Sequence, residues 1–277
     1  MKKNSLRCFI TGQNSRSPSL QQLARAVYYS NCLVGVVTAC ASLFIIDLEQ
    51  VNIDLKCFTF IFASTVFVYN FDRKSPRTVD LRNNPRRTRW LFQQRNFINS
   101  VNITCFLLCC WSFFTTVTLV KATFILSLLF ICLLYCLSRK YKKIPGLKNV
   151  TIAIVWSCSV TLLPAVWLKI EINWQLFILN FFMAFINSLI FDLRDTEGDR
   201  RNDIKSLAVL LGKSKCLMLI DALCVILLIS SLNHLHFIGF AFSAIIFFLH
   251  KNSIQSISRE AFLETVLIVP ILVLLFL

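Results

Sequence analysis

Residues 187–206 read NSLIFDLRDTEGDRRNDIKS and continue an apolar run that covers about residues 174–192. Acidic side chains therefore begin inside a segment whose hydropathy predicts removal from water, where charges are costly. If the segment stays helical, four polar side chains share one face at i, i+4, i+7 and i+11: Ser188, Asp192, Asp195 and Asp199. Carboxylates stacked in this way repel one another. The stripe therefore predicts a site for a divalent cation, and Mg²⁺ takes such oxygen ligands.

The same stretch has a second interpretation, in which it is a solvated acidic loop at the membrane surface. Three nearby guanidinium groups would then neutralise the acids: Arg194, Arg200 and Arg201. The position of the first acid argues against this interpretation, because Asp192 lies inside the apolar run rather than beyond it. We therefore expect the acids of the stripe to bind metal.

The composition of the chain identifies the environment of this segment. Of its 277 residues, 56% are hydrophobic, 26 are Phe and only 16% are charged, and the mean hydropathy is +0.68. Soluble domains carry about 25% charged residues. The bilayer must therefore be the solvent for most of the chain, which excludes disordered, collagenous and secreted disulfide-scaffold proteins.

Apolar segments of spanning length predict nine transmembrane helices. They lie at about residues 26–46, 56–71, 98–119, 122–138, 149–168, 174–192, 216–232, 235–250 and 261–277. The breaks near Val120 and Asn233 leave room only for a turn between antiparallel helices. We expect an all-α integral membrane fold, with a cytoplasmic segment at 1–25 and a single multi-pass membrane domain at 26–277.

The net charge of +15 indicates topology, because the basic residues lie between the apolar runs. Of the 29 Lys and Arg, 26 fall on one side of the helix ladder and three, Lys56, Lys121 and Lys169, on the other. The positive-inside rule places the N-terminus and the basic loops in the cytoplasm and the C-terminus outside. We therefore expect a protein of the cell inner membrane that contacts lipids and no nucleic acid.

A second polar cluster follows the second predicted helix, where residues 70–87 read NFDRKSPRTVDLRNNPRR. Two carboxylates, Asp72 and Asp80, precede a group of arginines. A pyrophosphate site requires this combination, with acids for the metal and guanidinium groups for the phosphate oxygens. Asn70 is a further candidate ligand and Arg86 a candidate phosphate contact. The alternative is an ordinary basic loop of a membrane protein.

A third basic loop, at residues 135–145, reads YCLSRKYKKIP and lies on the same face, between the fourth and fifth predicted helices. By itself it is equally compatible with a topology signal and with a phosphate clamp formed by Arg139 and Lys140.

Together the three loops resemble those of the UbiA superfamily of intramembrane prenyltransferases. The resemblance covers nearly the whole chain: nine helices, an acidic loop after helix two, a loop with Tyr, basic residues and Pro after helix four, and an acidic loop after helix six. Its most specific part is DLRDTEGD at 192–199 followed by IKSLAVLLG at 204–212, which is similar to the second acidic motif of the family.

The first acidic motif departs from the family pattern, which usually reads Asn-Asp-x-x-Asp-x-x-x-Asp. Val68 and Tyr69 stand where Asn-Asp is expected and Pro76 where the last Asp is expected, so only Asp72 matches. Pro76 disfavours helix at the preceding residue, and a turn there would return Asp80 toward the site. The number of bound metals and the type of reaction are therefore left open by this motif.

The resemblance implies a ring of helices around a cavity open to lipid, with the acidic loops meeting above it. It also implies Mg²⁺-dependent transfer of a prenyl group from a polyprenyl diphosphate to an aromatic or other lipophilic acceptor. The carboxylates assigned to catalysis are Asp72, Asp195 and Asp199, and the metal would be held by these together with Asp192. The residues assigned to the diphosphate are Arg139, Lys140, Lys205 and Arg86.

Other functions fit the same residues. A UbiA-type terpene cyclase would close the isoprenoid on itself, and a phosphoribosyl-type transferase would use a sugar diphosphate with a lipid phosphate acceptor. A non-catalytic lipid-binding homologue would have lost turnover along with the first motif. A small-solute transporter fits less well, because the charges cluster at one face rather than at the bilayer midplane and no internal repeat is evident.

Overall fold

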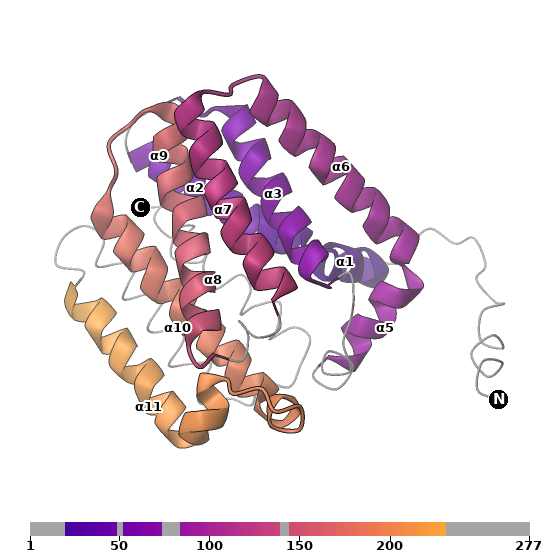
Figure 1. Cartoon of the computed structure of the whole chain (residues 1–277), viewed down its shortest axis with the longest axis vertical. Helices are drawn as coiled ribbons and strands as arrows, with labels where there is room; N and C mark the ends of the chain where they lie inside the picture. Colours follow the sequence, from indigo (N-terminus) through magenta and orange to yellow (C-terminus); the bar gives the residue numbers. More distant parts are fainter. Residues whose placement is uncertain (1–19, 49–51, 74–83, 139–143, 231–277) are drawn as a thin grey trace.

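The computed structural model of the chain describes residues 20–48, 52–73, 84–138 and 144–230, and every regular element in these ranges is a helix (Figure 1). In chain order the helices are α1 (Leu20–Tyr29), α2 (Cys32–Leu48), α3 (Leu55–Arg73), α5 (Pro85–Gln93), α6 (Arg95–Phe114), α7 (Leu119–Leu137), α8 (Leu147–Ser157), a π-helical turn (Cys158–Leu162), α9 (Leu163–Leu168), α10 (Trp174–Arg200) and α11 (Leu207–Ser230). The two helices expected at 235–250 and 261–277 lie outside the described residues.

The apolar segments that fall within the described ranges all form helices, which confirms the all-α membrane fold. Among the described residues, four helical segments are long and apolar enough to cross a membrane: α6, α7, the segment from α8 to α9, and α10. A fifth span results if α1 and α2 are taken as one bent pair, since their axes differ by 64°. The protein is therefore a multi-pass membrane protein.

The first span differs from the expectation of a single helix at 26–46. It is broken between α1 and α2, where Asn31 adopts a left-handed conformation with φ of 62°. Asparagine tolerates this conformation better than most residues. Asn31 is itself fully buried, so the break brings a polar side chain into the interior of the bundle.

The turn between α6 and α7 also lies a few residues from where it was expected. It occupies residues 115–118 rather than the region of Val120, and Lys121 already belongs to the first turn of α7. Thr118 caps the helix, because its Oγ1 accepts a hydrogen bond from the backbone N of Lys121 at 3.4 Å. Threonine is one of the residues that favour this N-cap position.

The helices form two groups (Figure 1). α3 packs against α2 and α6, and α10 packs against α8 and α11. α2 also contacts the π-helical turn, and α7 contacts α3, α8 and α9, so these two helices connect the groups. Gly35 permits the close approach of α2 to α3, because a Cβ at this position would lie 2.6 Å from Cγ2 of Val66.

The largest core lies where α2, α8, α10 and α11 meet, and it contains side chains with almost no exposed surface, such as Val37, Met183 and Ile220. α6 and α7 instead expose large apolar side chains outside the interior of the bundle, among them Ile103, Leu107, Trp111, Phe130 and Leu134. An apolar surface of this extent is unsuited to water and well suited to lipid. We conclude that α6 and α7 face the bilayer.

The two ends of the bundle carry different polar groups. At one end, Nε1 of Trp167 donates a hydrogen bond to Oδ2 of Asp54 at 3.0 Å, and Nζ of Lys121 lies 4.9 Å from the centre of the Trp167 ring. Asp54 precedes α3 and Asp72 lies at its C-terminal end, so the two acids are about 27 Å apart at 1.5 Å per residue. Asp54 and Lys121 therefore lie at one end of the bundle and Asp72 at the other, as the alternation of the charged loops predicts. Which side of the membrane each end faces stays a prediction.

Candidate active site

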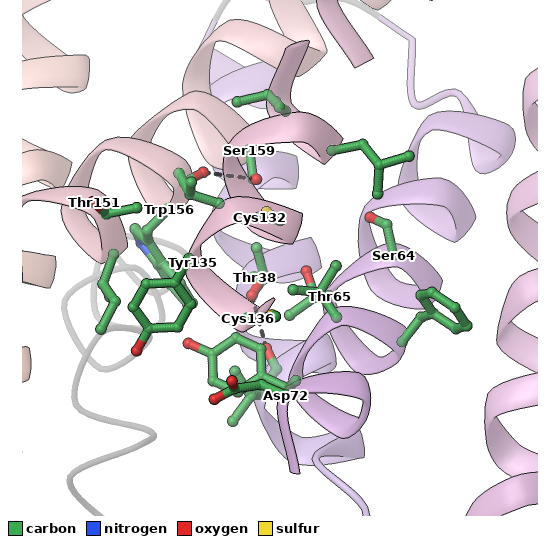
Figure 2. A pocket seen from close by; sticks show the side chains of 18 of the residues that line it. Thr38, Ser64, Thr65, Asp72, Cys132, Tyr135, Cys136, Thr151, Trp156 and Ser159 are labelled. Atoms are coloured by element: carbon green, nitrogen blue, oxygen red, sulfur yellow. Dashed lines mark hydrogen bonds between the residues drawn. The ribbon is translucent and has the colours of Figure 1, made fainter. Parts of the chain in front are cut away.

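A cavity of about 550 Å³ lies between the two helix groups, and its lining changes in character along the bundle. On α3, Asp72 lines the polar end and Phe60 lines the apolar part. These two positions are about 18 Å apart along a helix that rises 1.5 Å per residue. Figure 2 shows Asp72 at one end of the view and Ser159 at the other, with Tyr135 between them. The cavity is therefore elongated along the bundle.

Charged side chains from four helices converge on the polar end. They are Asp72 and Arg73 from α3, Arg87 from α5, Lys148 from α8, and Arg194 and Asp195 from α10. The remainder of the wall is mostly apolar and aromatic, with Phe67, Phe106, Phe113, Leu126 and Leu129 among its residues. The excess of basic over acidic groups at one end suits an anionic ligand, and the remainder suits a hydrocarbon.

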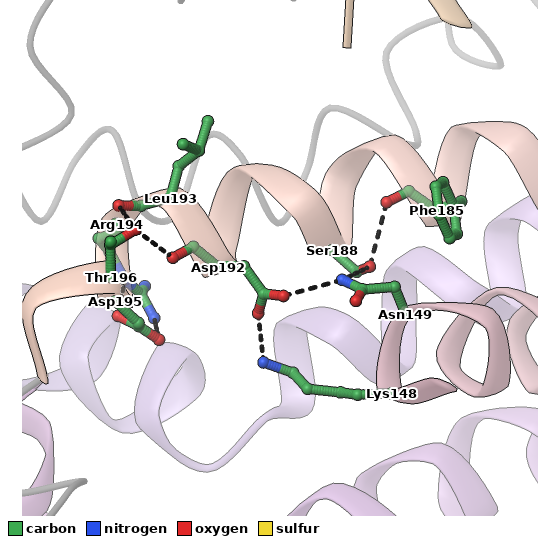
Figure 3. A network of polar contacts seen from close by, with 9 residues as sticks. All are labelled: Lys148, Asn149, Phe185, Ser188, Asp192, Leu193, Arg194, Asp195 and Thr196. Atoms are coloured by element: carbon green, nitrogen blue, oxygen red, sulfur yellow. Dashed lines mark hydrogen bonds and ion pairs between the residues drawn. The ribbon is translucent and has the colours of Figure 1, made fainter. Parts of the chain in front are cut away.

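The acidic stretch forms the C-terminal part of α10, which runs to Arg200 as its spacing predicts. Asp192 is fully buried and accepts hydrogen bonds from Nζ of Lys148 and, at 3.0 Å, from Nδ2 of Asn149. Asn149 also donates to Oγ of Ser188 at 2.8 Å (Figure 3). The start of α8 therefore binds two members of the predicted stripe.

The other two acids of the stripe have different surroundings. Asp195 lines the cavity and accepts two hydrogen bonds from its neighbour Arg194, from Nε to Oδ1 at 2.7 Å and from Nη2 to Oδ2 at 2.9 Å. Asp199 is buried and lies outside the cavity lining. Within the part of the chain that the structure describes, no three Asp, Glu, His or Cys side chains form a metal-binding group. Asp195 is therefore the acid of the stripe that can reach a ligand in the cavity.

Asn31, at the break between α1 and α2, connects two arginines of the polar end. Its Oδ1 accepts hydrogen bonds from Arg73 and, at 2.5 Å, from Nη2 of Arg87. Its Nδ2 donates to Oδ1 of Asn70 at 2.6 Å. The guanidinium carbon of Arg87 also lies 5.5 Å from the centre of the Tyr28 ring. One buried asparagine thus joins α3 and α5 and holds two cations at the cavity wall.

The residues singled out from the sequence are distributed unevenly around this cavity. Asp72 lies in the wall, and Asn70 is buried beside Asn31, outside the lining. Arg86 and Lys205 are exposed and do not line the cavity. The other candidates lie outside the described residues: Asp80, Arg139 and Lys140.

Several residues of the cavity wall were not candidates from the sequence, among them Arg73, Arg87, Lys148 and Asn187. Arg87 is adjacent to Arg86, and a helix rotates by about 100° per residue, so the helix phase decides which of the two faces inward. Asn84 marks the start of α5, because its side chain accepts a hydrogen bond from N of Arg87 at 3.2 Å, but this cap does not determine which face of the helix points to the cavity. Oδ1 of Asn187 is buried and has no hydrogen-bond partner among the described residues.

The acids of the cavity wall fit a divalent cation that is shared with an anionic ligand. Asp72 from α3 and Asp195 from α10 are the carboxylates of the lining within the described ranges. Mg²⁺ is usually bound through one or two carboxylates plus substrate phosphates rather than by an all-protein cage. These two side chains supply the hard oxygen donors that such a cation requires.

Comparisons with known proteins agree with the fold described above. The solved structure of a UbiA homolog from Archaeoglobus fulgidus bound to GPP and Mg²⁺ has a TM-score of 0.55 and 14% identity, covering 92% of this chain and 85% of that one. The structure of a digeranylgeranylglyceryl phosphate synthase gives 0.55 and 16% identity, covering 93% of this chain and 97% of that one. No curated protein sequence matches the chain. At these identities the likeness shows the fold alone.

The family follows from the sequence match. The model of the UbiA prenyltransferase family matches residues 36–261, which include all the helices from α3 to α11 and most of α2. This span also contains every charged residue of the cavity wall. The chain therefore belongs to the UbiA prenyltransferase family.

Proposed function

We propose that this protein transfers a prenyl group from a polyprenyl diphosphate to an aromatic or other lipophilic acceptor within the membrane. The observation that supports the proposal best is the division of the cavity into a charged end and a long apolar part. A polyprenyl diphosphate has the same division, with an anionic head and a hydrocarbon tail. Family membership supports the same type of chemistry.

The charged end would bind the diphosphate through the basic residues of the wall. Arg87 and Arg73 present guanidinium groups, which match phosphate oxygens in a bidentate manner, and Lys148 presents a compact ammonium group. Arg139, Lys140 and Lys205 stay candidates for the same head group by the family resemblance. The isoprenoid tail would lie along the Phe-rich walls of α3 and α6, where it is removed from water.

Asp72 and Asp195 would hold Mg²⁺ at the charged end, with Asp192 and Asp199 predicted from the family motif as further ligands. When bound, Mg²⁺ would neutralise charge on the diphosphate oxygens and make this group a better leaving group. The basic side chains of the wall act in the same direction, because fixed positive charges stabilise negative charge that develops during a reaction.

Transfer requires heterolysis of the bond between the allylic carbon and the diphosphate oxygen, and the electron pair leaves with the diphosphate. The cationic allylic carbon then accepts an electron pair from the acceptor. The proton that the acceptor loses goes to the departing diphosphate or to water beyond the charged end. Aromatic and aliphatic walls protect the allylic cation, because they exclude the water that would otherwise capture it.

A direct assay of the purified protein tests the proposal. GPP and DMAPP are suitable first donors, because structures of a UbiA homolog were solved with each of them. The protein in detergent receives one donor, Mg²⁺ and a panel of aromatic and glycerol phosphate acceptors, and mass spectrometry follows the products. A prenylated acceptor supports the proposal. A cyclic hydrocarbon formed without acceptor would indicate a cyclase, and donor binding without consumption would indicate a non-catalytic homologue.

A further inference from the structure

Lys148 places its ammonium group on a carboxylate that the family motif assigns to metal. Asp192 accepts a hydrogen bond from Nζ of Lys148 at Oδ1 and one from Nδ2 of Asn149 at Oδ2, at 3.0 Å. Both carboxylate oxygens therefore have protein donors. The two donors come from consecutive residues at the start of α8, so one helix turn supplies a donor to each oxygen of the carboxylate (Figure 3).

This arrangement leaves little opportunity for a metal ion at Asp192. The side chain of Asp192 has no exposed surface, whereas Mg²⁺ demands near-octahedral coordination and usually keeps several of its waters. Asp195 also accepts hydrogen bonds at both oxygens, from Arg194, but its side chain is 18% exposed and lines the cavity, where a ligand can reach it. Complete burial behind Lys148 is therefore what separates Asp192 from Asp195. A buried carboxylate with an ammonium and an amide donor is already compensated without a metal.

Lys148 differs from Asp192 in that it reaches the cavity. Its side chain keeps 25% of its surface exposed, and it lines the charged end together with Arg87 and Asp195. Asp192 lies behind it and fixes the position of the ammonium group. The cation at this part of the cavity wall is therefore the ammonium group of Lys148 on α8. The family motif alone predicts a metal ion there, bound by Asp192.

We propose that Lys148 is a fixed cation for the diphosphate, and that Asp192 is its positioning residue rather than a metal ligand. The inference rests on the proposed function and deepens it. Two consequences follow. The protein binds a diphosphate head group measurably without Mg²⁺, and a single divalent ion, held by Asp72 and Asp195, accompanies the bound substrate.

The test is calorimetric titration of the detergent-solubilised full chain with geranyl thiolodiphosphate, an analogue whose leaving-group bond is resistant to cleavage. Titrations are carried out in EDTA and again in Mg²⁺. Wild-type protein is expected to bind in both conditions. Lys148→Met alone leaves Asp192 buried without its counter-charge and is therefore expected to be unstable. The informative variant is Lys148→Met/Asp192→Asn, which removes both charges.

The double variant is expected to fold and to lose at least about tenfold in affinity in EDTA, because a charge-assisted hydrogen bond to the head group is missing. Arg201→Met is the matched control. Arg201 is an exposed cation near the same end of α10, paired with Glu197 and outside the cavity lining, so its loss should leave affinity within about twofold. Equal affinity of the double variant and the wild type in EDTA would show that Lys148 only compensates the charge of Asp192 and does not bind the diphosphate. This result would overturn the inference.

Counting metal ions gives a second readout. Mn²⁺ replaces Mg²⁺ in equilibrium dialysis with saturating analogue, and electron paramagnetic resonance measures the bound ions. One Mn²⁺ per chain is expected for the wild type and for Asp192→Asn alike. Two ions in the wild type, or loss of an ion in Asp192→Asn, would make Asp192 a metal ligand and refute the inference.

These results separate the inference from the proposed function. Wild-type protein that binds the analogue only with Mg²⁺ would refute the fixed-cation role of Lys148 and leave the proposed function intact. Wild-type protein that binds the analogue in neither condition would refute both.

Discussion

Asn31 Oδ1 accepts a hydrogen bond of 2.5 Å from Nη2 of Arg87, a residue that is 56 positions away in the sequence. The acceptor lies at the break between α1 and α2, and the donor lies in the first turn of α5. The same oxygen also accepts from Arg73. Both guanidinium groups line the cavity, so the break in the first span orders the charged end of the site.

Asn31→Gly should raise the KM for the prenyl diphosphate about tenfold, because two guanidinium groups lose the acceptor that orients them. Glycine keeps the left-handed backbone without strain, so the variant isolates the role of the side chain. Initial rates over a range of donor concentration, together with thermal unfolding, measure both effects.

Asn31→Ala provides the control for backbone strain. It should show the same KM as Asn31→Gly and a further loss of about 1 kcal/mol in unfolding free energy, since alanine is strained at positive φ. An unchanged KM in Asn31→Gly would mean that Arg73 and Arg87 do not depend on Asn31 for their position.

Asp72→Asn and Asp195→Asn should each lower kcat/KM at least about a hundredfold, because each 1.4 kcal/mol of lost transition-state stabilisation is tenfold and a carboxylate that holds the cation contributes several. Rates at increasing Mg²⁺ concentration provide the measurement. Asp203→Asn is the control, since Asp203 is exposed and lies outside the cavity lining.

Asp199→Asn tests whether Asp199 binds metal, as the family motif assigns, or does not, as its position outside the cavity wall indicates. The expected loss is smaller than that of Asp195→Asn. The motif assigns Asp199 to metal as strongly as Asp195, whereas the structure places only Asp195 in the cavity wall. A loss in Asp199→Asn as large as that in Asp195→Asn would favour the motif, and would show that ligand binding brings Asp199 to the metal.

The helices could be predicted because their signals are local. Hydropathy identifies a span within about 20 residues, and the spacing of Asp192, Asp195 and Asp199 indicates a helix that continues past the apolar run, as α10 does. The break at Asn31 could not be predicted in this way. Residues 26–46 contain no proline, and their only glycine, Gly35, lies inside α2 rather than at the break.

The partners within the site depend on tertiary contacts that a single sequence does not contain. Lys148 and Asp192 are 44 residues apart, and nothing in either segment indicates that they meet. Charge counts placed Arg86 and Arg87 in one basic group, and only the phase of α5 separates the exposed one from the buried one. The sequence therefore predicts which loops form the site better than it predicts the roles of their residues.

Lys121→Met should destabilise the protein by about 1 to 2 kcal/mol without changing the KM for the donor. The variant removes the ammonium group that lies over Trp167, and a desolvated cation–π contact is worth about this much. Lys121 is buried and lies at the end of the bundle opposite the charged site. Thermal unfolding in detergent, with donor kinetics on the same sample, measures the two quantities.

Lys169→Met is the control for this end of the bundle. Lys169 is exposed, so its replacement should change the unfolding free energy by no more than about 0.5 kcal/mol. If both variants were as stable as the wild type, the contact between Lys121 and Trp167 would contribute nothing measurable.

The distribution of basic residues predicts the orientation of the protein in the membrane. Reporter fusions after residues 90, 145 and 205 should report the cytoplasm, and a fusion at residue 117 should report the outer side. The first three positions lie at the end of the bundle that carries Asp72 and Lys148, and the turn at 117 lies at the end that carries Lys121. The positive-inside rule gives this orientation, because 26 of the 29 basic residues lie at the first end or in segments predicted to adjoin it.

A fusion after Leu277 tests the part of the chain beyond α11. It should report the outer side if the apolar segments at 235–250 and 261–277 each cross the membrane once. A cytoplasmic signal there, with the other fusions as expected, would mean that one of these segments does not cross. The charge pattern is weakest in this region, since Lys251 and Arg259 are the only basic residues between the two segments. If instead all five reporters gave the opposite sides, the helices would stand as described and the positive-inside assignment would be wrong.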